Sequence, residues 1–164
     1  MSGVIVVEEK KEKQMALELM GTSKAAYLTT VDAEGFPQTR AMFNTRNREQ
    51  FPKLVHLFKS HGADFMVYFT TNTSSSKVAD IRVHPRVSVY YCKPEESRGL
   101  MLSGLMEIVD DSRVKKSLWL EGMERYYPTG CDDPDYTVLR LFPGLGRGWN
   151  QDHTYRFVIG DRSE

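Results

Sequence analysis

Side-chain character alternates with a period of two from Ala25 onward, and this alternation limits the fold more than any other feature of the sequence. In the first such segment, Ala26, Leu28 and Thr30 would share one face of a strand. The further segments that predict strands are 36–44, 65–70, 87–92, 99–109, 137–142 and 155–159. Helical patterns interrupt the strands only twice, which disfavours a doubly wound parallel sheet. The sequence therefore predicts a mainly β fold, an antiparallel barrel of six or seven strands with helices on its outside.

Turn residues connect several of these strands. Asp32-Ala33-Glu34-Gly35 has the residue order of a type I turn, so the first two strands should form a hairpin. Pro37 lies near the beginning of the second strand, a position that suits a strand start or an edge. The glycine-rich stretch Gly144–Gly148 predicts a turn before the last strand.

Three helices are predicted from apolar spacing and capping residues. The first lies within residues 1–22 and should end near Gly21. The second covers Val78–Val83 and should stop before Pro85, because the residue that precedes a proline avoids helical geometry. The third should begin at the capping residues Asp110–Ser112 and continue to about residue 128.

Length and charge indicate one domain that spans residues 1–164. The 22 basic and 22 acidic residues cancel, which argues against nucleic acid or an anionic membrane as a partner. The longest apolar run, Phe65–Phe69, is far shorter than the ~20 residues of a transmembrane helix. The short apolar stretch Val4–Val7 is followed at once by charged residues, which is unlike a signal peptide. We therefore expect a cytoplasmic protein.

The sequence has no recognisable metal or nucleophile motif. Cys92 and Cys131 are far apart and form no C-x-x-C pair. The histidines, at positions 56, 61, 84 and 153, have none of the spacings typical of metal ligands. A G-x-S-x-G nucleophile elbow is absent, and no general acid or base can be assigned. We expect no bound metal and name no catalytic residue.

A cluster of hydroxyls next to a lysine, Thr70–Lys77, lies between a buried strand and a helix. Helix N-termini carry unpaired N–H groups and a partial positive charge, so this segment could hold a phosphate. Alternatively, Thr73 or Ser74 caps the helix and the rest is a polar loop. Arg40 is a second candidate cation, or else an exposed edge-strand arginine. Trp149 could be a stacking platform or a loop anchor.

Five blocks in order resemble the pyridoxamine 5′-phosphate oxidase-like, FMN-binding split-barrel family, and within it the general stress protein branch. The blocks are Y-L-T-T-V-D-A-E-G-F-P-Q-T-R-A-M from Tyr27, F-M-V-Y-F-T-T-N-T-S-S-S-K from Phe65, I-R-V-H-P-R-V-S-V-Y-Y from Ile81, G-L-M-L-S-G-L-M-E-I-V from Gly99 and Y-Y-P-T-G-C-D-D-P-D-Y-T-V-L-R-L from Tyr126. The resemblance implies a six-stranded antiparallel split β-barrel of Greek-key type. It also implies a homodimer with FMN at the interface.

Carried over by position, the resemblance assigns cofactor contacts to three short segments and two single residues. The residues are Arg40, Ala41, Met42, Phe43, Thr70, Thr71, Ser75, Ser76, Lys77, Gly99 and Trp149. Arg40 and Lys77 would meet the FMN phosphate. Ser76 and Gly99 depart from the family pattern, because related oxidases have an arginine and a glutamine there.

The function implied by the resemblance is an FMN-dependent oxidoreductase of unidentified substrate. The alternatives are a non-catalytic flavin-binding stress-response protein and a deazaflavin-dependent reductase; a carrier or nucleic-acid-binding barrel ranks last. Pyridoxamine 5′-phosphate should not be its substrate, since Thr45 replaces the lysine that binds the substrate phosphate in the oxidases. The stretch Leu118–Asp135 is rich in acidic residues, which would repel a substrate phosphate. The R-x-H motif near the end of the oxidase sequences is also absent.

Overall fold

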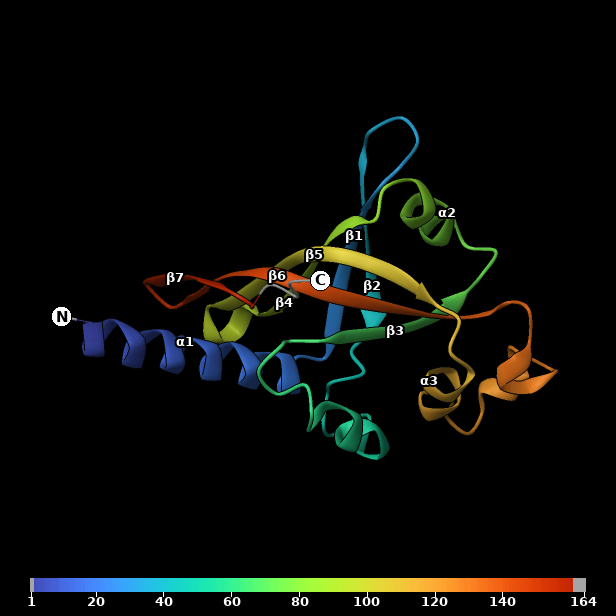
Figure 1. Ribbon diagram of the computed structural model, residues 1–164, viewed down its shortest axis with the longest axis horizontal. Helices are drawn as coiled ribbons and strands as arrows, with labels where there is room; N and C mark the ends of the chain where they lie inside the picture. The colour runs from blue at the N-terminus through green and yellow to red at the C-terminus, as the bar shows by residue number, and fades with distance from the viewer. Residues whose placement is uncertain (1, 161–164) are drawn as a thin grey trace.

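The computed structural model describes residues 2–160 and is shown in Figure 1. Its helices are α1 (Ser2–Thr22), α2 (Ser76–Val83) and α3 (Ser112–Ser117). Its strands are β1 (Ala25–Val31), β2 (Pro37–Phe43), β3 (Val67–Asn72), β4 (Arg86–Lys93), β5 (Arg98–Val109), β6 (Tyr136–Asn150) and β7 (His153–Val158). Short 3₁₀ turns occur at Pro52–Phe58, Pro94–Glu96, Met123–Arg125 and Gly130–Asp132.

One curled, wholly antiparallel sheet contains all the strands. Their order is β2-β1-β4-β5-β6-β3. β7 lies outside this order and forms a hairpin with residues 145–150 of β6. The curl brings the two end strands together: the Thr45 hydroxyl, just beyond β2, donates a hydrogen bond of 2.7 Å to the Tyr68 carbonyl of β3. Within residues 2–160, no backbone ladder joins β2 to β3. The barrel is therefore split along this line, as the resemblance implied.

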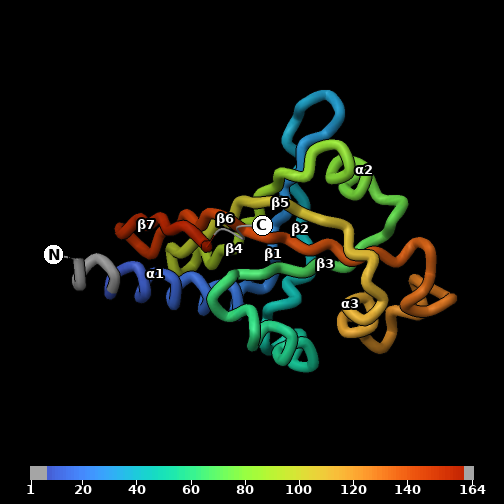
Figure 2. The backbone as a smooth tube through the Cα atoms, in the orientation of Figure 1, coloured from blue at the N-terminus to red at the C-terminus, as the bar shows by residue number. Residues whose placement is uncertain are grey.

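The barrel interior holds the main core. Alternate residues of the central strands, among them Leu28, Val89, Leu100 and Leu139, have no exposed surface. Burial of one such side chain contributes about 1.5–3 kcal/mol. A second cluster lies under α3 and the 3₁₀ turn Pro52–Phe58. α1 and the β6–β7 hairpin lie at one end of the sheet, and α2 and α3 lie at the other (Figure 2).

Local sequence signals locate several elements correctly. The backbone N–H of Gly35 donates to Asp32 O over 3.0 Å, closing the predicted turn between β1 and β2. β2 begins at Pro37, as expected for a residue without an amide proton. α2 ends at Val83, before Pro85, and Asp111 caps α3 by accepting from the Arg113 N–H at 2.8 Å.

The prediction of a turn at Gly144–Gly148 is wrong. β6 runs through this stretch without a break, and its hairpin turn to β7 lies at residues 151–152. The glycines serve close packing: a Cβ at Gly146 would lie 2.5 Å from the Phe157 ring, and one at Gly148 would lie 2.5 Å from the Tyr155 ring. Trp149 is accordingly a strand residue, and no loop precedes it.

The predicted length of the third helix is also wrong. α3 covers only Ser112–Ser117, and a 3₁₀ turn at Met123–Arg125 follows it. The chain leaves helical geometry after Leu118, and Gly122, with a left-handed φ of 95°, precedes the 3₁₀ turn. Leu118 is nevertheless buried and packs with Trp119 and Met123 in the second core cluster. The apolar spacing therefore predicted which side chains face the core, although it did not predict the helix length.

Candidate functional site

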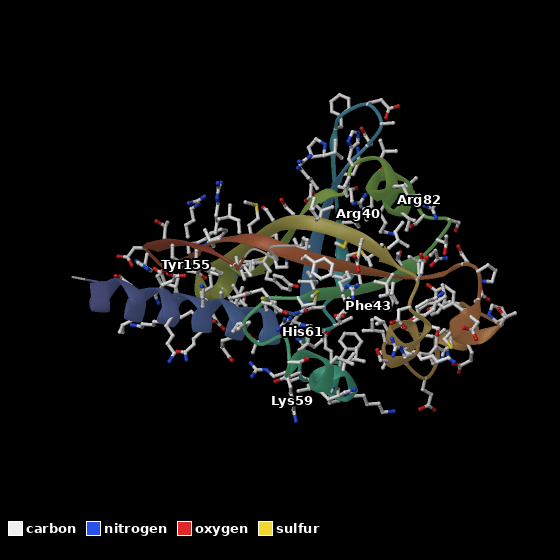
Figure 3. The ribbon with its side chains drawn as sticks, in the orientation of Figure 1. Arg40, Phe43, Lys59, His61, Arg82 and Tyr155 are labelled. Atoms are coloured by element: carbon white, nitrogen blue, oxygen red, sulfur yellow. The ribbon has the colours of Figure 1, made fainter. Side chains whose placement is uncertain are left out.

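Arg40 lies on the face of β2 that points toward α2 (Figure 3). Its Nη1 donates to the Thr30 hydroxyl at 2.7 Å, and its Nη2 lies 3.8 Å from Asp80 Oδ2 on α2. The same Asp80 oxygen accepts from Thr30 at 2.7 Å. Burial lowers the pKa of Arg40, and the negative charge of Asp80 opposes this shift. The guanidinium is therefore held in a fixed position and is not an exposed edge residue.

Lys77 occupies the first turn of α2 and points toward the end of β3. Its ammonium donates to the Thr71 hydroxyl at 3.0 Å. Burial lowers the pKa of Lys77, and the nearby positive charge of Arg40 lowers it further. The fold thus brings two partly desolvated cations, separated by many residues in the sequence, into one electrostatic environment.

The start of α2 has no side-chain cap. Ser75 is the N-cap residue, but its hydroxyl donates to Asn72 O at 2.7 Å. The alternative in which Thr73 or Ser74 caps this helix is wrong. The Thr73 hydroxyl donates to Pro134 O at 2.8 Å, while the Ser74 backbone N–H donates to Asp135. An uncapped helix start retains N–H groups that can donate hydrogen bonds to an anion.

A groove of about 680 Å³ opens beside these cations. Six of the residues that the sequence assigned to the cofactor line it: Ala41, Met42, Phe43, Thr70, Thr71 and Lys77. Arg40 does not line the groove, but its charge lowers the pKa of Lys77, which does. Ser75 and Ser76 adjoin Lys77 at the helix start but do not line the groove.

Gly99 and Trp149 lie outside this groove. They face each other across the β5–β6 ladder, and the Trp149 indole stacks on Tyr90 with ring centroids 5.6 Å apart. A Cβ at Gly99 would overlap the indole ring of Trp149. The glycine therefore creates the space for the tryptophan, and the chain does not bring this pair to its own groove.

Sequence reasoning missed the other residues that line the groove. They are Lys24, Ala25, Gln50, Asn72, Met123, Tyr126 and Tyr127. Most come from connecting segments whose local pattern carries no signal. Tyr127 is fixed by donating to Asn72 Oδ1 at 3.0 Å, and burial raises its pKa. Neither a carboxylate nor an imidazole is found among the described residues that line the groove.

The outer face of the sheet forms a second surface. Tyr27, Tyr90 and Met101 are register partners on β1, β4 and β5, and they alternate with buried core residues. Tyr27 and Trp149 are 36% and 37% exposed. We call Tyr27, Tyr90, Met101 and Trp149 the aromatic face. Exposed apolar groups that lie together in this way are typical of interaction surfaces.

Comparison with known protein families identifies the chain. The model of the "Pyridoxamine 5′-phosphate oxidase like" family matches residues 10–160. The protein belongs to the pyridoxamine 5′-phosphate oxidase-like family. A comparison with curated proteins finds no match. No helix within residues 2–160 is both long enough and apolar enough to cross a membrane.

One solved structure supports the family assignment of this pyridoxamine 5′-phosphate oxidase-like protein, and two less similar ones share its fold. A Clostridium acetobutylicum protein related to general stress protein 26 of B. subtilis is 30% identical, with a TM-score of 0.71 over 91% of this chain and 95% of that one. General Stress Protein 26 from Bacillus anthracis is 19% identical, with a TM-score of 0.64 over 88% and 98%. An F420 reductase is 24% identical, with a TM-score of 0.53 over 79% and 93%.

Proposed function

We propose that this protein binds FMN in the groove between β2, β3 and α2 and acts as an FMN-dependent oxidoreductase. The FMN phosphate would contact Arg40 and Lys77, with the Thr71 hydroxyl beside them. The flavin ring would lie along the groove against Met42 and Phe43. Membership of the pyridoxamine 5′-phosphate oxidase-like family supports this choice of cofactor.

The observation that carries the proposal is the pairing of the two cations. Burial and mutual repulsion both lower the pKa of Lys77, so the fold loses free energy by holding this ammonium near Arg40. Asp80 lies 3.8 Å from Arg40 and already accepts a hydrogen bond from Thr30, so it compensates only part of this charge. A phosphate dianion between the two cations would offset the cost, because charge-assisted hydrogen bonds are the strong ones.

The residues present fit FMN better than a dinucleotide. A groove of about 680 Å³ is within the range of ligand sites. The sequence contains no G-x-G-x-x-G for a pyrophosphate. When bound, FMN supplies the redox chemistry. The chain's own residues would bind the phosphate, orient the ring and exclude water from one of its faces.

We further propose that the active form is a homodimer built on the aromatic face. Gly99 and Trp149, which the family pattern assigns to the cofactor, lie outside the groove of their own chain. A second copy seated on this face would bring its Trp149 toward the first copy's cofactor. Isologous pairing of this kind is the commonest oligomer symmetry.

A non-catalytic flavin-binding role is the second candidate. The absence of a carboxylate or imidazole among the described groove residues favours it. Turnover of FMN-loaded protein with a reduced nicotinamide would separate the two roles, since only an oxidoreductase consumes the donor faster than free FMN does.

Titration of apo protein with flavins tests the cofactor. We expect FMN to bind more tightly than FAD, riboflavin or a deazaflavin, with riboflavin losing the phosphate contribution. FAD binding tighter than FMN would refute the assignment, and a preference for the deazaflavin would favour the reductase alternative.

A further inference from the structure

We propose that a chamber next to the FMN groove binds a neutral, flat, mostly apolar molecule, of aromatic or quinoid type, and rejects phosphate esters. The chamber has a volume of about 350 Å³ and is a separate hollow from the groove. The two share Phe43, Thr70, Met123 and Tyr126. Its role as a substrate site rests on the proposed function, because only a cofactor in the groove gives a molecule in the chamber something to react with.

The interior of the chamber is apolar. Leu54 and Leu118, 2% and 1% exposed, form part of its wall and belong to the second core cluster. Phe51 adds an aromatic wall and meets the Phe43 ring edge-on, with centroids 6.1 Å apart. A ligand among these groups gains by removing apolar surface from water and finds few hydrogen-bond partners.

Two large aromatic side chains remain in water where the groove and the chamber meet. Phe43 is 75% exposed and Tyr126 is 69% exposed, although each lines both hollows. Aromatic surface left uncovered at a concave site is typical of an interaction site, and a ligand in the chamber would cover it. A flat ring would satisfy both side chains, because aromatic groups pair by stacking or by edge contacts.

The charged side chains that line the chamber do not favour binding of an anion. Among the described residues that line it, the only charged side chains are Glu121 and Arg125; they are opposite in sign and both are exposed. Thr45 lies in the wall, and its hydroxyl proton is already used by the Tyr68 carbonyl at 2.7 Å. A phosphate dianion in the chamber would lose its hydration without a buried cation in exchange, which is costly.

Two matched probes test the preference for a neutral ring. 2-Naphthol and 2-naphthyl phosphate share one ring system and differ only in the phosphate. Equilibrium dialysis against FMN-loaded protein should give an affinity for 2-naphthol that is higher by roughly tenfold or more, because desolvation of the dianion is uncompensated. FMN keeps the phosphate ester away from Arg40 and Lys77 in this experiment.

Variants assign the binding to the chamber. Leu120→Trp should fill it and reduce 2-naphthol binding at least about tenfold while the FMN affinity stays unchanged, since Leu120 lines the chamber and not the groove. Val83→Trp is the control, at a residue of α2 that is 67% exposed and lines neither hollow. If Leu120→Trp does not fold, Phe51→Ala should also weaken 2-naphthol binding by removing the aromatic wall.

Several outcomes overturn the proposal. One is that 2-naphthyl phosphate binds more tightly than 2-naphthol and that Arg125→Ala abolishes this binding. Another is that 2-naphthol still binds to both chamber variants. A third is that folded protein does not bind 2-naphthol at all. Failure of the proposed function has a different signature, which is no FMN binding in the titration. The dialysis is then repeated on apo protein with saturating inorganic phosphate, and a 2-naphthol preference lost in Leu120→Trp still supports the chamber.

Discussion

At the scale of single residues, the candidate site consists of two cations and the hydroxyls around them. Arg40 is fixed by Thr30 and Asp80, while Lys77 has Thr71 as its hydrogen-bond partner. Asp80 forms an ion pair with Arg40, whereas Lys77 has only a neutral hydroxyl as its partner. We therefore expect the charge of Lys77 to respond more strongly to a bound phosphate. Its contribution to phosphate binding can be measured by substitution and by pH.

Lys77→Ala should weaken FMN binding by roughly ten- to a hundredfold, because one charge-assisted contact contributes about 1.5–3 kcal/mol. The apo protein should remain folded, since the substitution also removes the repulsion from Arg40. Arg82→Ala is the matched control: Arg82 is an exposed cation in the last turn of the same helix. Fluorescence titration measures all three proteins, and equal affinities would show that Lys77 is only a surface residue.

FMN affinity should also fall as the solution becomes alkaline. Burial and Arg40 lower the pKa of Lys77, so in the apo protein this ammonium deprotonates earlier than a free lysine. Above that pKa, binding must first restore the proton, and affinity declines with rising pH. At the acid end, affinity should decline below about pH 6, where a phosphate monoester takes up its second proton.

The Lys77→Ala variant separates the two limbs of this profile. It should keep the acid limb, which belongs to the ligand, and lose the part of the alkaline limb that Lys77 causes. The stability of the apo protein should change in the opposite direction. A basic group with a lowered folded pKa destabilises the fold when charged, and this unfavourable contribution begins to decrease as pH rises past the folded pKa and is gone above the pKa of the unfolded chain. Identical alkaline limbs in the two proteins would exclude Lys77.

At the scale of elements, β6 shows how a neighbouring strand changes what a sequence pattern means. Its glycines lie opposite aromatic residues of β7 and leave room for their rings. The strand therefore extends to Asn150 and brings Trp149 to the outer face of the sheet. The hairpin contributes to the core through Tyr155 and Phe157, which are 7% and 2% exposed.

Gly146→Ala should destabilise the protein by about 1–3 kcal/mol, because the new methyl group would lie 2.5 Å from the Phe157 ring. Gly144→Ala is the control in the same strand: its Cβ would meet nothing within 4 Å, so stability should stay the same or rise slightly. Urea unfolding measures both. Phe157→Leu added to Gly146→Ala should recover part of the loss, and equal stability of the two single variants would contradict the packing argument.

At the scale of the whole molecule, the groove and the aromatic face lie on different parts of one curled sheet. The groove is at the split between β2 and β3, and the aromatic face covers β1, β4, β5 and β6. A monomer would leave Tyr27 and Trp149 partly in water and the cofactor accessible on one side. A second copy would resolve both features at once.

We expect sedimentation equilibrium to give a dimer at micromolar concentration. Tyr27→Lys should shift it toward monomer, because a charge buried in this interface must be desolvated. Phe36→Lys is the control, at a residue of the β1–β2 turn that is 65% exposed and lies away from the aromatic face. FMN affinity should fall together with dimerisation in Tyr27→Lys. A wild-type monomer that binds FMN with full affinity would refute the interface.

The parts of this structure that depend on local chemistry can be predicted from the amino-acid sequence. Period-two alternation gave the strands, the residues from Asp32 to Gly35 gave the first hairpin turn, and Pro85 gave the end of α2. The same local reasoning selected Arg40 and the segment Thr70–Lys77. Residue type and near-neighbour spacing are sufficient for such features, because they depend on backbone geometry within a few residues.

The way in which these parts meet depends on packing between distant segments. The tertiary structure brought Lys77 close enough to Arg40 for the arginine's charge to lower the lysine's pKa, through the packing of α2 on β1, and it added Lys24 and Tyr127 from connecting segments. It also made the glycines of β6 strand residues, because the rings of Phe157 and Tyr155 on the neighbouring strand β7 occupy the space beside them, and it placed Trp149 outside its own groove. Contacts between residues distant in sequence depend on sheet order and curl, which one chain segment does not encode.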